Sequence, residues 1–127
     1  MRFIENYVEL QKHRAGSQLT VTAQGFETLS GFTIPPQLLM PLVENCFKHV
    51  SHFADRPNYI QLSCRKENDR FLFHALNSFD PSRRPDMPGI GLATTRKRLD
   101  LLCGDRYTLT TAAGDDRFEA TLQLFLP

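Results

Sequence analysis

The most informative stretch of this sequence reads Pro36-Gln37-Leu38-Leu39-Met40-Pro41-Leu42-Val43-Glu44-Asn45-Cys46-Phe47-Lys48-His49-Val50-Ser51. Proline is tolerated in the first turn of a helix, so Pro36 predicts a helix start. At about 100° per residue, apolar and polar side chains separate onto opposite sides of this helix. The apolar side comprises Leu39, Leu42, Val43, Cys46, Phe47 and Val50, and the polar side comprises Gln37, Glu44, Asn45, Lys48 and His49. The pattern predicts an amphipathic helix that packs on a core through one side.

Apolar periodicity predicts the remaining elements on both sides of this helix. They are a helix over 3–14 that ends at Gly16, strands over 18–23 and 32–34, a hairpin over 59–65 and 71–76, a loop over 77–88, a helix that follows Gly91 and stops at Gly104, and a hairpin over 107–112 and 118–126. The 71–76 strand is apolar on both faces apart from His74, which is typical of a central strand. Paired strands with interleaved helices predict a two-layer α/β sandwich, whose mixed, mostly antiparallel sheet is covered on one face by helices. A doubly wound sheet would need strands and helices that alternate one by one.

The composition indicates one globular domain in the cytoplasm. The 127 residues include 15 Lys and Arg and 14 Asp and Glu, which gives a formal net charge of +1 and no basic excess for nucleic acid. No apolar run approaches the ~20 residues of a membrane span, and the first residues lack the apolar segment of a signal peptide. The widely spaced, odd set of Cys46, Cys64 and Cys103 disfavours a metal knuckle or a disulfide framework. We expect buried free thiols in a reducing compartment.

Four polar side chains of the central helix form a candidate binding patch. Glu44 and Lys48 are four residues apart, as are Asn45 and His49, so all four share one surface. The carboxylate and the amide oxygen suit a hydrated divalent cation, and the ammonium and the imidazole suit a polyphosphate. On this helix alone, the favoured interpretation is simpler: a solvated face with a Glu44–Lys48 ion pair.

A second candidate is the pair Gly89 and Gly91 at the start of the following helix. Two glycines let the backbone approach a ligand closely, and free N–H groups at a helix N-terminus attract anions. By itself the pair favours a flexible connector followed by a helix entry.

In this order and spacing, the two features resemble the N-box and the G-box of GHKL-type ATPases. Residues 34–49 are similar to the N-box, and more narrowly to that of the sensor histidine kinases that pair with LytTR-type response regulators. Gly89-Ile90-Gly91-Leu92, followed by Arg98-Leu99-Asp100-Leu101-Leu102, is similar to the G-box and its helix. Residues 7–14 resemble the end of the helix that leads into this ATPase domain, so the resemblance covers nearly the whole chain.

The resemblance implies a Bergerat-type sandwich that binds ATP and Mg²⁺ between the N-box helix and a lid loop over 79–88. It implies that Asn45 is the magnesium ligand and that Glu44 and Asn45 are the catalytic residues, with Glu44 polarising a water or orienting a ligand. The implied nucleotide-binding residues are Asn45, Lys48, His49, Asn77, Gly89, Gly91 and Leu92. Within that set, the two side chains at 48 and 49 would approach the phosphates, and the two glycines would present backbone N–H groups to them.

Two departures from the family pattern bear on the nucleotide. Asn77 stands where most GHKL proteins have the aspartate that reads the adenine amino group, and the glycines that follow it are absent. No Gly-Thr pair precedes the last strand, where this chain has Asp116-Arg117-Phe118. An asparagine carries both an acceptor and a donor, so it would read adenine in one orientation and guanine in the other. We expect weaker ATP binding and a less sharp separation of ATP from GTP.

The resemblance also implies an organisation for the chain. Residues 1–15 would be the end of a linker helix from a missing dimerisation and phosphoacceptor domain, and residues 16–127 the ATP-binding catalytic domain. The implied reaction transfers the ATP γ-phosphoryl group to a histidine on that separate helical domain, which serves a response regulator in a two-component system. The implied parent kinase is a homodimer in the inner or plasma membrane, with this domain in the cytoplasm. The alternative is a GHKL-fold module that is impaired in nucleotide binding and acts as an interaction or regulatory domain.

Overall fold

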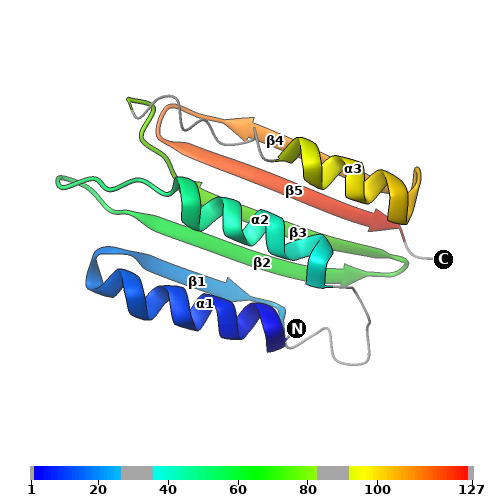
Figure 1. The fold of residues 1–127 in the computed structure, drawn as a ribbon, viewed down its shortest axis with the longest axis horizontal. Helices are drawn as coiled ribbons and strands as arrows, with labels where there is room; N and C mark the ends of the chain where they lie inside the picture. Colours follow the sequence, from blue (N-terminus) through cyan, green and yellow to red (C-terminus); the bar gives the residue numbers. More distant parts are fainter. Residues whose placement is uncertain (1, 27–35, 83–91, 126–127) are drawn as a thin grey trace.

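The computed structural model describes residues 2–26, 36–82 and 92–125 (Figure 1). In chain order, the described elements are α1 (Arg2–Ala15), the short 3-10 helix η1 (Gly16–Gln18), β1 (Thr20–Gln24), α2 (Pro36–His49), β2 (Tyr59–Glu67), β3 (Arg70–Ser78), α3 (Leu92–Cys103), β4 (Tyr107–Ala113) and β5 (Arg117–Phe125). The strand expected over 32–34 and both glycines of the G-box lie outside the described residues.

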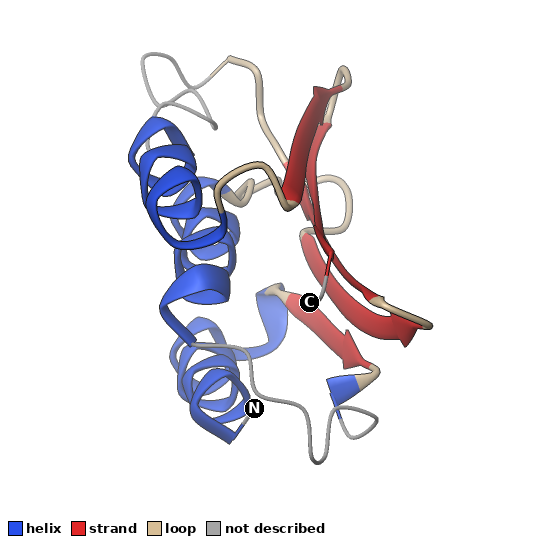
Figure 2. Cartoon of the chain, turned by 90° about the vertical axis from the view of Figure 1, so that its right-hand side faces the viewer, coloured by secondary structure: helices blue, strands red, loops and turns tan. Residues whose placement is uncertain are grey.

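The five strands form one mixed sheet in the order β1-β2-β3-β5-β4. β1 pairs with β2 in parallel, and the other neighbours pair antiparallel. β3 is central, as its apolar character on both faces predicted. The helices lie on one face of the sheet (Figure 2), so the predicted two-layer sandwich is confirmed.

The core lies between the sheet and the helical layer. Strand residues that point toward the helices alternate with residues on the open face, as in β3, where Phe71, Phe73 and Ala75 are almost fully buried. Within the helical layer, α2 lies between α1 and α3 (Figure 1) and packs on β3. None of the described helices combines the length and the apolar character that a membrane crossing requires.

The flanking helices correct one expectation about α2. Glu44 and Lys48 are exposed, as the helical wheel predicted, but Asn45 and His49 are only 9% and 8% exposed. A wheel separates polar from apolar residues without regard to neighbouring helices. Because α2 has a helix on each side, its sides are covered as well as the face on the sheet. The prediction that Asn45 and His49 lie on a solvated face was therefore wrong.

The element ends follow the glycine signals closely. α1 ends before Gly16, which has a φ of 70°, and α3 ends before Gly104, which has a φ of 61° and donates its N–H to the carbonyl of Asp100 at 3.0 Å. The apolar residues of the helices are not all buried: Leu10 of α1 and Leu102 of α3 are each 53% exposed.

Gly25 follows β1 at a point where the chain lies against β2. It has a φ of 88°, and a Cβ atom there would lie 1.8 Å from the backbone oxygen of Cys64. Only glycine fits this position, because both the backbone conformation and the space exclude a side chain. No motif or periodicity in the sequence indicates this role.

Candidate functional site

An open cleft of about 620 Å³ is lined by residues of the three helices. The lining residues come from α1, α2 and α3: Tyr7, Gln11, Pro41, Glu44, Asn45, Phe47, Lys48, His49, Leu92, Thr94, Thr95 and Arg98. Five of the residues predicted for the nucleotide site, at positions 44, 45, 48, 49 and 92, therefore lie together. Asn77 does not line this cleft, and Gly89 and Gly91 lie outside the described residues.

Asn45 lies at the wall of this cleft, and its side-chain amide has no hydrogen-bond partner in the described part of the chain. The residue is 9% exposed, but neither atom of its amide is among the fully buried polar atoms that lack a partner, so both atoms remain accessible. The amide oxygen is therefore available to a ligand in the cleft.

Asn58 provides the contrast, because it is buried to the same extent and is fully bonded. Its Oδ1 accepts hydrogen bonds from Ser51 Oγ at 2.6 Å and from the Phe53 N–H at 2.7 Å. Its Nδ2 donates to the carbonyls of Phe53 at 3.0 Å and Gln18 at 3.4 Å. Ser51 Oγ also lies 2.7 Å from Ser78 Oγ, so this network joins the segment after α2 to the end of β3. Asn58 has the bonding of a structural residue.

The side chain of Asn77 is only partly hydrogen-bonded, so it is intermediate between those of Asn45 and Asn58. It is fully buried in β3, where it pairs with Ile60 of β2 and Phe118 of β5. Its Nδ2 donates to the carbonyl of Ser78 at 2.9 Å, while its Oδ1 has no partner among the described residues. If the amide were flipped, its oxygen would face the carbonyl oxygen of Ser78, which is unfavourable. The hydrogen bond to Ser78 therefore fixes the unpartnered atom of Asn77 as the acceptor oxygen. Of the two orientations that the sequence allowed, the structure has one.

The charged residues of the cleft do not neutralise one another. Glu44 and Lys48 form no ion pair with each other or with another residue of the described ranges, so the predicted surface pair is absent there. Arg98 of α3 adds a second cation to the lining. In the sequence, Arg98 stands out only as part of the helix that follows the G-box. Its position in the cleft depends on how α3 packs beside α2, which local patterns do not specify.

α1 forms one wall of the cleft, so it is part of the helical layer. Ile4 and Val8 are buried, and the Tyr7 ring packs edge-on against Phe47 of α2 with centroids 5.8 Å apart. Burial raises the pKa of Tyr7, and the nearby Glu44 carboxylate raises it further, so the phenol is neutral at physiological pH.

The thiol closest in sequence to Asn45 is inert. Cys46 is buried against the core, and burial raises its pKa to about 12. Cys64 is also a buried free thiol and Cys103 is a half-buried one, so the expectation of buried free cysteines is confirmed for two of the three.

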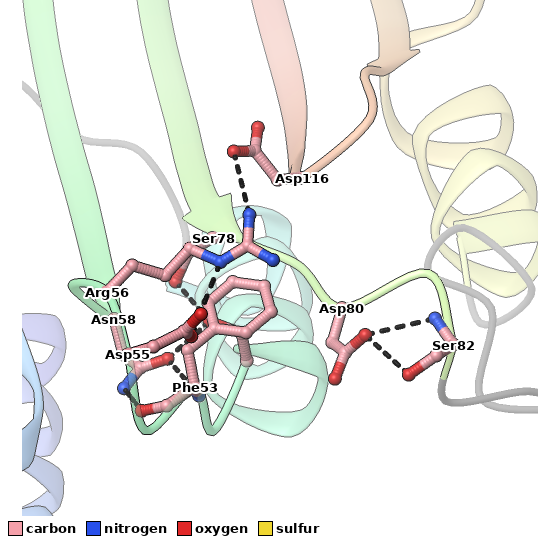
Figure 3. Close-up of polar contacts among 9 residues, drawn as sticks. Phe53, Asp55, Arg56, Asn58, Ser78, Asp80, Ser82 and Asp116 are labelled. Carbon is pink, nitrogen blue, oxygen red and sulfur yellow. Dashed lines mark hydrogen bonds and ion pairs between the residues drawn. The ribbon is translucent and has the colours of Figure 1, made fainter.

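A second set of polar contacts holds the loops at the end of α2 (Figure 3). The Arg56 guanidinium lies 4.0 Å from the centre of the Phe53 ring and 3.7 Å from an Asp116 carboxylate oxygen. The Asp116 carbonyl accepts the N–H of Phe79 at 2.8 Å, where the predicted lid begins. Within that segment, Asp80 Oδ1 accepts from the N–H of Ser82 at 3.0 Å and from its hydroxyl at 2.7 Å. In this chain, Asp116 therefore fastens the start of the predicted lid at the position where the family pattern has Gly-Thr.

The donor set fits a magnesium ion only together with a phosphate ligand. The part of the chain that the structure describes contains no group of three or more His, Cys, Asp or Glu side chains that could hold a metal. Mg²⁺ keeps several waters and is commonly bound through one or two protein oxygens together with substrate phosphates. The unsatisfied Asn45 amide can supply one such oxygen.

Comparison with curated proteins finds a sensor histidine kinase, although no family model matches the chain. BtsS of Escherichia coli K12 is 26% identical over 125 residues, which covers 95% of this chain and 22% of BtsS. BtsS of Shigella flexneri gives the same values. The chain thus spans about a fifth of the length of the curated relatives it matches.

Comparison with solved structures finds histidine kinase catalytic domains. The catalytic domain of the histidine kinase ThkA has a TM-score of 0.65 at 14% identity, covering 99% of this chain and 92% of that one. The histidine kinase domain of the Erythrobacter litoralis EL346 blue-light activated kinase has a TM-score of 0.65 at 14% identity, covering 98% and 60%. The chain has the α/β sandwich of histidine kinase catalytic domains, as the GHKL resemblance implied.

Proposed function

We propose that this chain is the ATP-binding catalytic domain of a two-component sensor histidine kinase. Its reaction would be transfer of the ATP γ-phosphoryl group to a histidine on a separate helical domain. The observation that carries the proposal is the contrast between the buried asparagines: the amide of Asn45 and the oxygen of Asn77 lack partners among the described residues, whereas Asn58 is fully bonded. Both unsatisfied groups are positions that the family resemblance assigns to the nucleotide.

The chain's own residues would bind and orient the reactants, since phosphoryl transfer depends mainly on positioning and charge. Asn45 would hold magnesium through its amide oxygen, and Lys48 and His49 would contact the phosphates from α2. Glu44, exposed beside Asn45, would orient a ligand or a water. Bound magnesium would neutralise charge on the phosphate oxygens. Leu92, with Gly89 and Gly91 before it, would form the phosphate end of the site at the start of α3.

The surroundings of this domain are part of the same proposal. Residues 1–15 would continue from a dimerisation and phosphoacceptor domain, and residues 16–127 would be the catalytic domain. A response regulator of the LytTR type would receive the phosphoryl group from that acceptor domain. The parent would be a homodimer in the inner or plasma membrane, with this domain in the cytoplasm.

Calorimetric titration of the purified chain with ATP, with and without Mg²⁺, tests the proposal directly. We expect saturable binding that strengthens when Mg²⁺ is present, because one amide oxygen cannot hold the ion without the phosphates. Absence of heat under both conditions would contradict nucleotide binding. That outcome would favour the second candidate, an interaction module of the same fold that is impaired in nucleotide binding, which the replacement of the family aspartate by Asn77 supports.

The orientation of Asn77 leads to a prediction about base selectivity. Its free oxygen can accept from the amino group of adenine but would face the carbonyl oxygen of guanine, so we expect the wild-type chain to prefer ATP. In Asn77→Ala the preference for ATP over GTP should fall by about tenfold, since one buried hydrogen bond and one repulsion are removed together. Competition of ATP and GTP against a fluorescent nucleotide measures this ratio.

Asn77→Asp is the matched variant for this prediction. It keeps the acceptor and loses the donor to Ser78, so it should retain the preference for ATP while lowering thermal stability. An ATP-to-GTP ratio that is the same in the wild type and in Asn77→Ala would show that Asn77 does not contact the base.

A further inference from the structure

Three consecutive basic residues of α3 have different surroundings. Arg96 donates a hydrogen bond from Nη1 to the carbonyl of Leu109 at 2.8 Å, which links α3 to β4. Lys97 is exposed and does not line the cleft, whereas Arg98 is exposed and lines it. Arg98 forms no hydrogen bond or ion pair with another described residue. The nearest acid along α3, Asp100, accepts a hydrogen bond from the hydroxyl of Tyr107 at 2.6 Å instead.

The geometry of α3 directs Arg98 toward the same space as Asn45. Side chains on a helix lean toward its N-terminus, so Arg98 extends over Thr94, which also lines the cleft. Lys48 faces this space from α2, and the start of α3 adds the positive end of a helix dipole. The amide of Asn45, which lacks a hydrogen-bond partner in the described ranges, lines the same cleft. Two cations and a free amide therefore face one cleft, and neither cation forms an ion pair with Glu44, the carboxylate of the same lining.

Asn77 lies outside the lining of the cleft, and the directions of α2 and α3 relate its position to that of Arg98. The Ser51 N–H, just after α2, donates to the carbonyl of Ser78 at 2.9 Å, so Asn77 lies near the end of α2. α3 runs in the opposite direction to α2 (Figure 1), and Arg98 is half-way along it. A ligand that contacts Asn77 with its base and Asn45 with its phosphates would extend its last phosphate groups toward Arg98.

We propose that Arg98 is a phosphate-binding residue that contacts the terminal phosphate groups of the nucleotide from α3, opposite Lys48. The inference rests on the proposed function and adds a residue to which the sequence resemblance gives no role. A guanidinium presents several donors in a planar fork that matches two phosphate oxygens, which a lysine ammonium does not. Arg98 would thereby make affinity depend on the number of phosphates.

The test compares Arg98→Gln with Lys97→Gln. Lys97→Gln is the matched control, because it removes one positive charge from the neighbouring position of the same helix. Calorimetry in Mg²⁺ would measure ATP, ADP and AMP binding, with inorganic tripolyphosphate as a probe that has no base. Arg98→Gln should weaken ATP and tripolyphosphate binding by at least about tenfold and leave AMP unchanged, because a charge-assisted bidentate contact is lost. Lys97→Gln should leave all four unchanged, and Arg98→Lys should restore only part of the ATP affinity.

The outcomes separate this inference from the proposed function. If the wild-type chain binds no nucleotide, the proposed function fails. Weaker binding of tripolyphosphate by Arg98→Gln than by the wild type then still tests whether Arg98 contacts phosphate. If the wild type binds ATP but Arg98→Gln weakens ATP and AMP equally, or weakens neither, Arg98 is not a contact to the terminal phosphates. Equal losses in Arg98→Gln and Lys97→Gln would show a general charge effect and would overturn the inference as well.

Discussion

The Asn45→Ala variant is expected to lose magnesium-dependent ATP binding and to keep its stability. The amide oxygen is the metal ligand that we propose, and no neighbouring described carboxylate cluster replaces it. Loss of groups that merely support a metal ligand costs about 10- to 100-fold in metal affinity, so loss of the ligand should weaken MgATP binding by at least about 100-fold. Stability should stay about constant or rise slightly, because the Asn45 side chain makes no hydrogen bond to another described residue and alanine has the higher helix propensity.

Two titrations on the same preparation check this expectation. Calorimetry with ATP should show that Mg²⁺ strengthens binding in the wild type and has no effect in Asn45→Ala. Urea unfolding should give a midpoint at or above that of the wild type. An undiminished effect of Mg²⁺ in the variant would remove Asn45 from the site, and a large loss of stability would show that its amide is satisfied within the fold.

The Asn58→Ala variant is expected to show the opposite behaviour and to lower the free energy of unfolding by about 3 kcal/mol. Four hydrogen bonds end at this side chain, of which the one to Gln18 is long at 3.4 Å, and each of the others contributes about 1 kcal/mol. The partners at Ser51 and Phe53 would be left without their bonds. That loss is a large part of the ~5–15 kcal/mol that stabilises a typical domain.

Urea unfolding of Asn58→Ala beside Asn45→Ala provides a matched pair. Both variants replace a buried asparagine by alanine, at 8% and 9% exposure, so they differ chiefly in the hydrogen bonds that are lost. Equal unfolding free energies for the two variants would mean that the hydrogen bonds of Asn58 do not stabilise the fold more than the side chain of Asn45 does. The free amide of Asn45 would then no longer point to a ligand.

Sequence patterns predicted the architecture because periodicity is a local property. The alternation in residues 59–65, the apolar run in residues 71–76 and the glycines after α1 and α3 identified the elements and their ends, and pairing the strands gave the sheet. Such patterns could not predict which side chains are buried between neighbouring helices. The wheel of α2 assigned Asn45 and His49 to solvent, because it does not include the helices that pack on either side.

The candidate site was predicted where it depends on one helix and missed where it depends on two. The four-residue spacing grouped Glu44 with Lys48 and Asn45 with His49, and all four line one cleft. Arg98 and Tyr7 reach the same cleft from other helices, so their roles depend on helix packing. Asn58 follows a loop that carries no periodic signal, and only the folded contacts reveal its network.

The place of β1 in the sheet has a consequence for the order in which the domain opens. β1 is an edge strand that pairs with β2 alone, through five residues, whereas β3 is paired with a strand on each side. Peripheral elements with few contacts open at a lower free energy than the centre of a sheet, so β1 should leave before β3 when the domain opens. Asn77 lies in β3, between β2 and β5. The proposed base contact therefore lies in the part of the domain that opens late.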